Sequence, residues 1–130
     1  MRLEGKIALV TGTSPNICGG IAEGLADEGA AIVCVDIRQE YVDGCAKAIA
    51  EAGGRAIGLV CDVTNEEQVK DTVEQARQAF GGVDILVNGA VIFNRKGVLS
   101  MPLAEWRSQI DVILSGAFLF TKYATQLMID

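Results

Sequence analysis

Four short segments each follow an apolar run in this sequence, and their residue types suit the binding of a nucleotide. Gly12, Asp36, Asp62 and Asn88 stand at or just past the ends of these runs. A glycine loop that opens a helix presents backbone N–H groups and the positive helix end to a phosphate. An acidic side chain at the end of the next strand can accept both hydroxyls of a ribose. The chemistry that these residues indicate is the binding of adenosine and a diphosphate.

The first of these segments, VTGTSPNICGG at residues 10–20, looks like a glycine-rich phosphate loop in which two glycines are replaced. Gly12 supplies the tight turn, whereas Asn16 and Cys18 stand where glycine is usual. Asn tolerates left-handed backbone, and Cys is small enough for close packing of a helix on a strand. On its own the pattern is more often a plain strand-to-helix turn, so the assignment depends on the other segments.

Asp36 lies 24 residues after Gly12 and favours NAD over NADP. Its carboxylate would repel a 2′-phosphate by about 4 kcal/mol per charge pair at ~4 Å and an effective dielectric of ~20. Arg38 could attract such a phosphate, but a solvated arginine, or one stacked on adenine, is its more ordinary role. The sequence therefore predicts NAD as the cofactor, with NADP as the less favoured alternative.

The other two segments have two interpretations each. Asp62 could accept the adenine amino group beside Val63, or its side chain could cap the turn that follows. Asn88 stands with Gly89 and Ala90 where a second ribose would lie, although Asn and Gly are also ordinary turn residues. Neither segment identifies a site by itself.

The apolar runs predict a doubly wound parallel sheet with helices on both faces, a three-layer α/β fold. Strands are expected near residues 6–10, 31–36, 55–61 and 84–89, with segments of helical period between them. The helix predicted over 66–80 has Asn65 as its N-cap and Gly81 as its stop. Right-handed crossovers place the four segments at one edge of the sheet. We expect one domain, residues 1–130.

Composition argues against several other classes of protein. Eleven basic against seventeen acidic residues give a net charge of −6, without the basic cluster that nucleic acid requires. The longest apolar stretch, residues 112–120, is shorter than a membrane span, and MRLEGKIALV does not fit a signal peptide. We expect a soluble, cytoplasmic protein without membrane contact. The four cysteines form no CxxC pair and histidine is absent, so no metal site or histidine-dependent triad is expected.

Taken in order, these segments resemble the short-chain dehydrogenase/reductase family. The matching residues are Thr11-Gly12, Asp36, Cys61-Asp62-Val63 and residues 84–90, and the similarity continues through Glu105-Trp106 and the helix beyond. The resemblance implies a Rossmann-like fold and hydride transfer between NAD(H) and a secondary alcohol or ketone. It also implies contacts to the cofactor: the diphosphate at Gly12, Ser14, Asn16 and Ile17, the adenosine ribose at Asp36 and Ile37, adenine at Asp62 and Val63, and the nicotinamide side at Asn88, Gly89 and Ala90.

The chain departs from the family pattern in three places. The family's Asn-Asn-Ala-Gly is Asn88-Gly89-Ala90-Val91 here, and a functional Asn of the next helix corresponds to Ile113, whose simpler role is helix packing. The family's catalytic Ser and Tyr-x-x-x-Lys are missing from residues 1–130, since neither Tyr41 nor Tyr123 has a Lys four residues later. We expect no catalytic residue and no turnover from this chain alone, and a fold incomplete on its C-terminal side. A non-catalytic dinucleotide-binding module is the alternative.

The last predicted helix, from about residue 103, is apolar on more than one face. One face must cover the sheet, and the resemblance implies that another packs on a second subunit, so we expect a homo-oligomer, a dimer or tetramer. Trp106 either packs in the same way or borders the substrate. A methyltransferase-like domain is a third interpretation, because an acidic residue after the second strand can also hold the ribose of S-adenosylmethionine.

Overall fold

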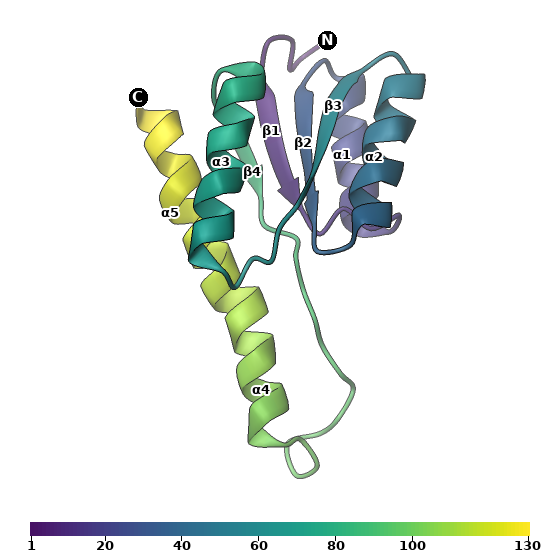
Figure 1. The fold of residues 1–130 in the computed structure, drawn as a ribbon. Coiled ribbons are helices and arrows are strands. Elements are labelled where there is room, and N and C mark those ends of the chain that lie inside the picture. The colour runs from purple at the N-terminus through teal and green to yellow at the C-terminus, as the bar shows by residue number, and fades with distance from the viewer.

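The computed structural model describes residues 1–130, in which strands and helices alternate along the chain (Figure 1). The strands are β1 (Ile7–Thr11), β2 (Ala31–Asp36), β3 (Arg55–Val60) and β4 (Ile85–Val87). All of them pair in parallel, in the order β3-β2-β1-β4. The predicted parallel sheet is confirmed, and each strand lies within two residues of its predicted bounds.

Helices cover both faces of this sheet (Figure 1). On one face lie α1 (Ile17–Asp27) and α2 (Gln39–Glu51), and on the other lie α3 (Glu66–Phe80) and α5 (Gly116–Ile129). Successive β1 side chains alternate between the two layers. Ala8 and Val10 belong to the core beneath α1 and α2, whereas Leu9 belongs to the core beneath α3 and α5. Because both faces are covered, the central strands β1 and β2 are apolar up to their last residues, Thr11 and Asp36.

The bounds predicted for α3 are confirmed together with both of its end signals. The Asn65 side chain accepts a hydrogen bond from the Gln68 backbone N–H at 3.1 Å. Gly81 has a φ of 100°, the left-handed conformation that ends many helices. This helix places the Asp62 turn at the carboxyl edge of the sheet, next to the end of β2.

The last helical stretch begins at Leu103 as predicted, but it is not uniform. α4 (Leu103–Ile110) continues into a π-helical turn, η1 (Asp111–Ser115), before α5 begins. By length and composition alone the stretch Leu103–Ile129 could cross a membrane, a test that a core helix of a soluble protein also passes. Phe120 and Ala124 of α5 are fully buried in this protein's core. The expected absence of membrane contact stays a prediction.

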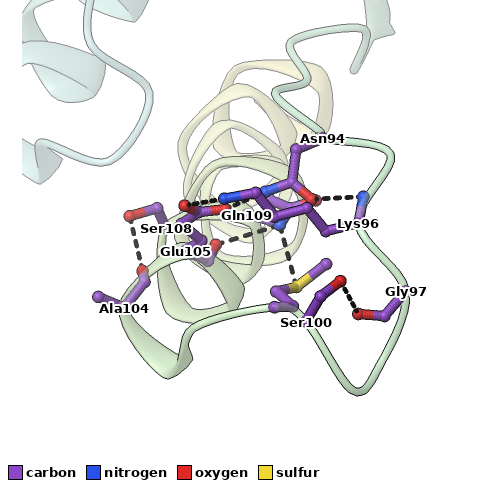
Figure 2. A network of polar contacts seen from close by, with 9 residues as sticks. Asn94, Lys96, Gly97, Ser100, Ala104, Glu105, Ser108 and Gln109 are labelled. Carbon is purple, nitrogen blue, oxygen red and sulfur yellow. Dashed lines mark hydrogen bonds and ion pairs between the residues drawn. The ribbon is translucent and has the colours of Figure 1, made fainter.

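An irregular segment, residues 88–102, connects β4 to α4 and runs away from the sheet (Figure 1). Figure 2 shows how a polar network ties it to the first turns of α4. The Glu105 carboxylate accepts hydrogen bonds from the Asn94 amide and from Lys96 Nζ, the latter at 2.6 Å. Gln109 donates to the Met101 sulfur at 3.4 Å. Residues 94–101 of the segment are therefore held by α4.

Candidate functional site

The carboxyl edge of the sheet brings together residues from all four strand ends. A cavity of about 110 Å³ lies there, lined by Gly12, Asp36, Ile37, Cys61, Asp62, Val63, Ala90, Val91, Ile92 and Val112. Six of the eleven predicted cofactor contacts are in this set. The other five, Ser14, Asn16, Ile17, Asn88 and Gly89, belong to the same loops. The predicted clustering is observed, and contact with a cofactor stays a prediction.

Gly12 holds the first loop close to two neighbouring strands. Its N–H donates to the Val35 carbonyl at 2.8 Å, and Thr13 donates to the same oxygen through both its N–H and its hydroxyl, each at 3.3 Å. The φ of Gly12 is 76°, and an added Cβ would lie 2.5 Å from the Gly89 carbonyl oxygen. Both the backbone conformation and the space therefore require glycine at this position.

The first turn of α1 offers unpaired donors of the kind that bind phosphate. No hydrogen bond in the structure uses the backbone N–H of Ser14, Asn16, Ile17 or Cys18. Asn16 is the N-cap of α1, but its side chain makes no capping bond. Its φ is −103°, so our argument that Asn stands here because it tolerates left-handed backbone is wrong. The residues at this helix start fit an anion through backbone amides alone.

At the end of β2, Asp36 is one of the two charged residues, with Asp62, that line the cavity. Its Oδ1 accepts from the Arg38 N–H at 3.1 Å, which leaves Oδ2 without a partner. Arg38 instead forms an ion pair with Glu40 and lies over the Tyr41 ring, 4.8 Å from its centroid. These contacts favour the interpretation of Arg38 as a surface arginine. Ile37, beside Asp36, is 64% exposed, and its contact with the adenosine ribose stays a prediction.

Asp62 caps the turn after β3, as one of its two interpretations predicted. Its Oδ1 accepts from the Thr64 N–H at 2.9 Å and from the Thr64 hydroxyl at 2.7 Å, while Oδ2 has no partner. Val63 is buried, and its side chain packs so closely on α5 that a Cβ on Gly116 would lie 2.6 Å from Val63 Cγ2. Any contact of Val63 with a ligand would therefore involve its backbone.

Thr11 positions the turn at residues 88–90, a role that the sequence analysis did not assign. Its hydroxyl oxygen accepts from the N–H groups of Gly89 and Ala90, at 3.0 and 3.1 Å. The same hydroxyl donates to the Val87 carbonyl at 3.4 Å, and Thr11 is 2% exposed. A polar residue at the end of an otherwise apolar strand was the available signal. Asn88 donates through Nδ2 to the Thr121 hydroxyl of α5 at 3.2 Å.

Ile113 lies in η1 beside the nicotinamide end of the predicted site. With Asn88, Ala90 and Val91 it lines a small cavity of about 40 Å³. Ile113 is 43% exposed, so it fills the role of a packing residue only in part. Val91 is 57% exposed and lines both this cavity and the larger one next to it. Apolar side chains therefore replace the family's polar and glycine residues on this side.

The largest concavity of the molecule, about 580 Å³, lies at the opposite edge of the sheet. It is bordered by Glu4, Glu23, Asp27 and Arg55 and contains none of the predicted site residues. The structure has no cluster of three or more His, Cys, Asp or Glu side chains that could hold a metal ion. The carboxyl edge is thus the candidate site.

Comparisons with known proteins agree with this geometry. The family model described as short chain dehydrogenase matches residues 6–130. A 3-oxoacyl-(acyl-carrier-protein) reductase of Thermotoga maritima is 35% identical over 99% of this chain and 52% of its own length. A D-threitol dehydrogenase of Mycolicibacterium smegmatis is 33% identical over 99% of this chain and 50% of its own. The chain spans about half the length of these relatives.

Among solved structures, an NAD⁺-bound xylitol dehydrogenase superposes with a TM-score of 0.95 at 34% identity, over 99% of this chain and 50% of its own. The superposition therefore confirms the Rossmann-like fold that the strand order indicates. Membership of the matched family also decides against the methyltransferase-like alternative. The chain has a parallel sheet of the order 3-2-1-4, a glycine turn against β2 and a family match over nearly every residue. We conclude that the chain belongs to the short-chain dehydrogenase family of oxidoreductases.

Proposed function

We propose that this chain binds NAD(H) and is the dinucleotide-binding part of an oxidoreductase that acts on a secondary alcohol or ketone. The observation that carries the proposal is the set of unpaired backbone N–H groups at residues 14 and 16–18, placed beside Gly12 and Asp36. Backbone donors at a helix start suit a diphosphate, and a carboxylate at the end of β2 suits the ribose hydroxyls. When bound, the nicotinamide supplies the hydride acceptor or donor of the reaction.

The preference for NAD over NADP is supported by the charges around Asp36. Asp36 lines the cavity, while the nearest arginine, Arg38, is engaged by Glu40 and Tyr41. A 2′-phosphate would approach the Asp36 carboxylate without a free cation to offset the repulsion. The Thr11 hydroxyl and the Asn88 amide hold the 88–90 turn on the nicotinamide side. We assign no acid or base role to any residue of this chain.

The surface of the last helices supports the proposal of a homo-oligomer. More than half of each of four large apolar side chains along α4, η1 and α5 is exposed: Leu103, Trp106, Leu114 and Phe118. Large apolar side chains in such a row are typical of a surface covered by other protein. We propose a soluble, cytoplasmic assembly that takes a small-molecule substrate and neither nucleic acid nor membrane.

The alternative, a dinucleotide-binding module without catalysis, is favoured by one observation. Val91 and Ile113, both half exposed, stand where the family has glycine and a functional Asn. A module of this kind would bind NADH as tightly as an enzyme does. The test is a fusion of this chain to the C-terminal half of a relative, which supplies the family's Ser and Tyr-x-x-x-Lys. If the chain is only a binding module, the fusion will not oxidise NADH with any ketone. Turnover by that fusion would exclude the module.

Titration calorimetry with NADH and NADPH tests the proposal itself. We expect NADH to bind more tightly than NADPH. Asp36→Ala should lower the ratio of the NADH affinity to the NADPH affinity about tenfold. The effect is no larger because Asp36 is partly exposed and its repulsion of the 2′-phosphate is screened. Asp43→Ala removes the same charge from an exposed position of α2 and should leave the ratio unchanged. The proposal fails if the folded chain binds neither nucleotide. The assignment of Asp36 fails if its variant keeps the parent's ratio.

A further inference from the structure

Gly89 is enclosed by the first loop and α1 so tightly that it has no room for a side chain. A Cβ built on Gly89 would lie 2.1 Å from the Cys18 sulfur and 2.6 Å from the Thr11 carbonyl oxygen. Gly89 does not have a positive φ, so its backbone conformation would accept any residue. The constraint is one of space, and the Cys18 side chain is its nearest source.

These two positions are also two of the places where the chain departs from the family pattern. The pattern has glycine at position 18 and Asn at position 89, whereas this chain has cysteine at 18 and glycine at 89. The space between α1 and the 88–90 turn thus holds one side chain, and here it comes from the helix. The cysteine at position 18 and the glycine at position 89 each depart from the family pattern, but in the structure the larger residue at 18 fits the space left by the smaller one at 89.

Cys18 is suited to this packing role and not to reactivity. It is partly exposed and belongs to the first turn of α1, next to the unpaired N–H groups. Burial raises the pKa of its thiol, so the side chain is neutral at physiological pH. A neutral, compact side chain in van der Waals contact with a backbone can set the separation of two loops.

We propose that Cys18 is a positioning residue, whose side chain replaces the one missing at Gly89 and sets the distance between the 88–90 turn and the diphosphate loop. The inference rests on the proposed function in one respect: the two loops would hold the two ends of the dinucleotide. Gly12 reinforces the same contact, since a Cβ there would meet the Gly89 carbonyl at 2.5 Å. Moving the turn should therefore disturb the nicotinamide end more than the adenosine end.

A double-mutant cycle tests the proposal with the chain of 130 residues. The variants are Gly89→Ala, Cys18→Gly and the double variant, and each is assayed for thermal unfolding and for binding of NADH and of ADP-ribose, which lacks nicotinamide. We expect Gly89→Ala to weaken NADH binding by about tenfold, with a smaller loss for ADP-ribose. The same substitution in the Cys18→Gly background should cost about threefold less, because the contact with the Cys18 sulfur is then removed while the contact with the Thr11 carbonyl remains. The Thr11 carbonyl contact is present in both backgrounds and cancels.

Two controls separate positioning from general destabilisation. Gly97→Ala lies in the same segment with no atom within 4 Å of its added Cβ, and it should change neither binding nor unfolding. Cys18→Ser keeps a side chain of similar size and should retain the parent's NADH affinity. The proposal is overturned if the two single substitutions are additive, or if Gly89→Ala has no effect.

The experiment also distinguishes this inference from the proposed function. If the parent chain binds no NADH, the proposed function fails, and the cycle in the unfolding temperature still decides whether Cys18 and Gly89 are coupled. If Gly89→Ala does not fold, recovery of folding in the double variant supports the pair, and failure of both to fold contradicts it.

Discussion

The part of the chain before β4 and the part from β4 onward differ in how completely their apolar side chains are buried. Residues 31–35 of β2 are all fully buried, whereas all three residues of β4 are partly exposed. Twelve of the seventeen exposed large apolar side chains fall within residues 91–129. The central strands β1 and β2 are thus covered by the chain's own helices, while both edge strands are partly exposed and the part of the chain after β4 presents apolar surface. This difference agrees with a chain that spans half the length of its relatives.

The difference in coverage is tested most directly on α5, because one of its two phenylalanines is buried and the other is exposed. Phe120 is fully buried in the core with α3, and Phe118 is 62% exposed. We expect Phe120→Ala to lower the free energy of unfolding by about 3–5 kcal/mol because of the cavity that it leaves. At protein concentrations low enough for the chain to be monomeric, Phe118→Ala should change it by less than about 0.5 kcal/mol, because the side chain is then exposed to solvent. Denaturant unfolding measures both, and a large, concentration-dependent loss in Phe118→Ala would mean that a second copy covers this face.

The contact between the first loop and the 88–90 turn is tested next at Gly12. Its φ of 76° and the 2.5 Å approach to the Gly89 carbonyl make any side chain costly. We expect Gly12→Ala to lower the free energy of unfolding by about 1–3 kcal/mol and to abolish NADH binding. Gly24→Ala, in the exposed middle of α1 with no atom within 4 Å, should stabilise the protein by up to about 1 kcal/mol. Equal effects of the two substitutions would contradict the contact.

The fold could be predicted because the apolar runs of the strands and the end signals of α3 are local features of the sequence. Asn65 and Gly81 act within one turn of the helix that they delimit, so their residue types are sufficient evidence. Asp36 and Asp62 could be placed at the same edge because the carboxyl ends of parallel strands meet there. Packing across the sheet was not needed for these predictions.

The parts that could not be predicted depend on contacts between distant residues. The Thr11 hydroxyl meets the 88–90 turn, 77 or more residues away, and the Cys18 sulfur meets Gly89. The π-helical turn at Asp111–Ser115 has no composition that marks it. The reason we gave for Asn16 was wrong because it was argued from a preference of the residue type and not from the backbone observed there.

A loss of stability in the same range as that of Gly12→Ala is expected at Thr11, where the substitution removes one hydroxyl. Thr11→Val keeps the shape of the side chain but leaves the N–H groups of Gly89 and Ala90 without their acceptor. We expect a loss of about 1–3 kcal/mol in the free energy of unfolding. Thr72→Val is a matched control, since Thr72 is equally buried and its hydroxyl donates to the Gln68 carbonyl within α3. A similar loss in both variants would show that the 88–90 turn does not depend on Thr11.

The smallest effect is expected where α3 meets α5 at the surface. The Tyr123 hydroxyl donates to the Glu66 carboxylate, and this bond, with Lys122 nearby, lowers the pKa of Glu66 below its ordinary value of 4.5. A carboxyl whose pKa is lowered by folding stabilises the protein fully above its ordinary pKa, and that contribution disappears as the pH falls through the lowered value. The unfolding temperature of the parent should therefore exceed that of Glu66→Gln slightly at pH 7, and the gap should close as the pH falls below 4.5 and through the lowered pKa. Glu67→Gln, which loses only an exposed pairing with Lys70 on the same helix, should show no such closing gap. Equal unfolding temperatures of the parent and Glu66→Gln at pH 7 would mean that α5 is held on α3 by apolar packing alone.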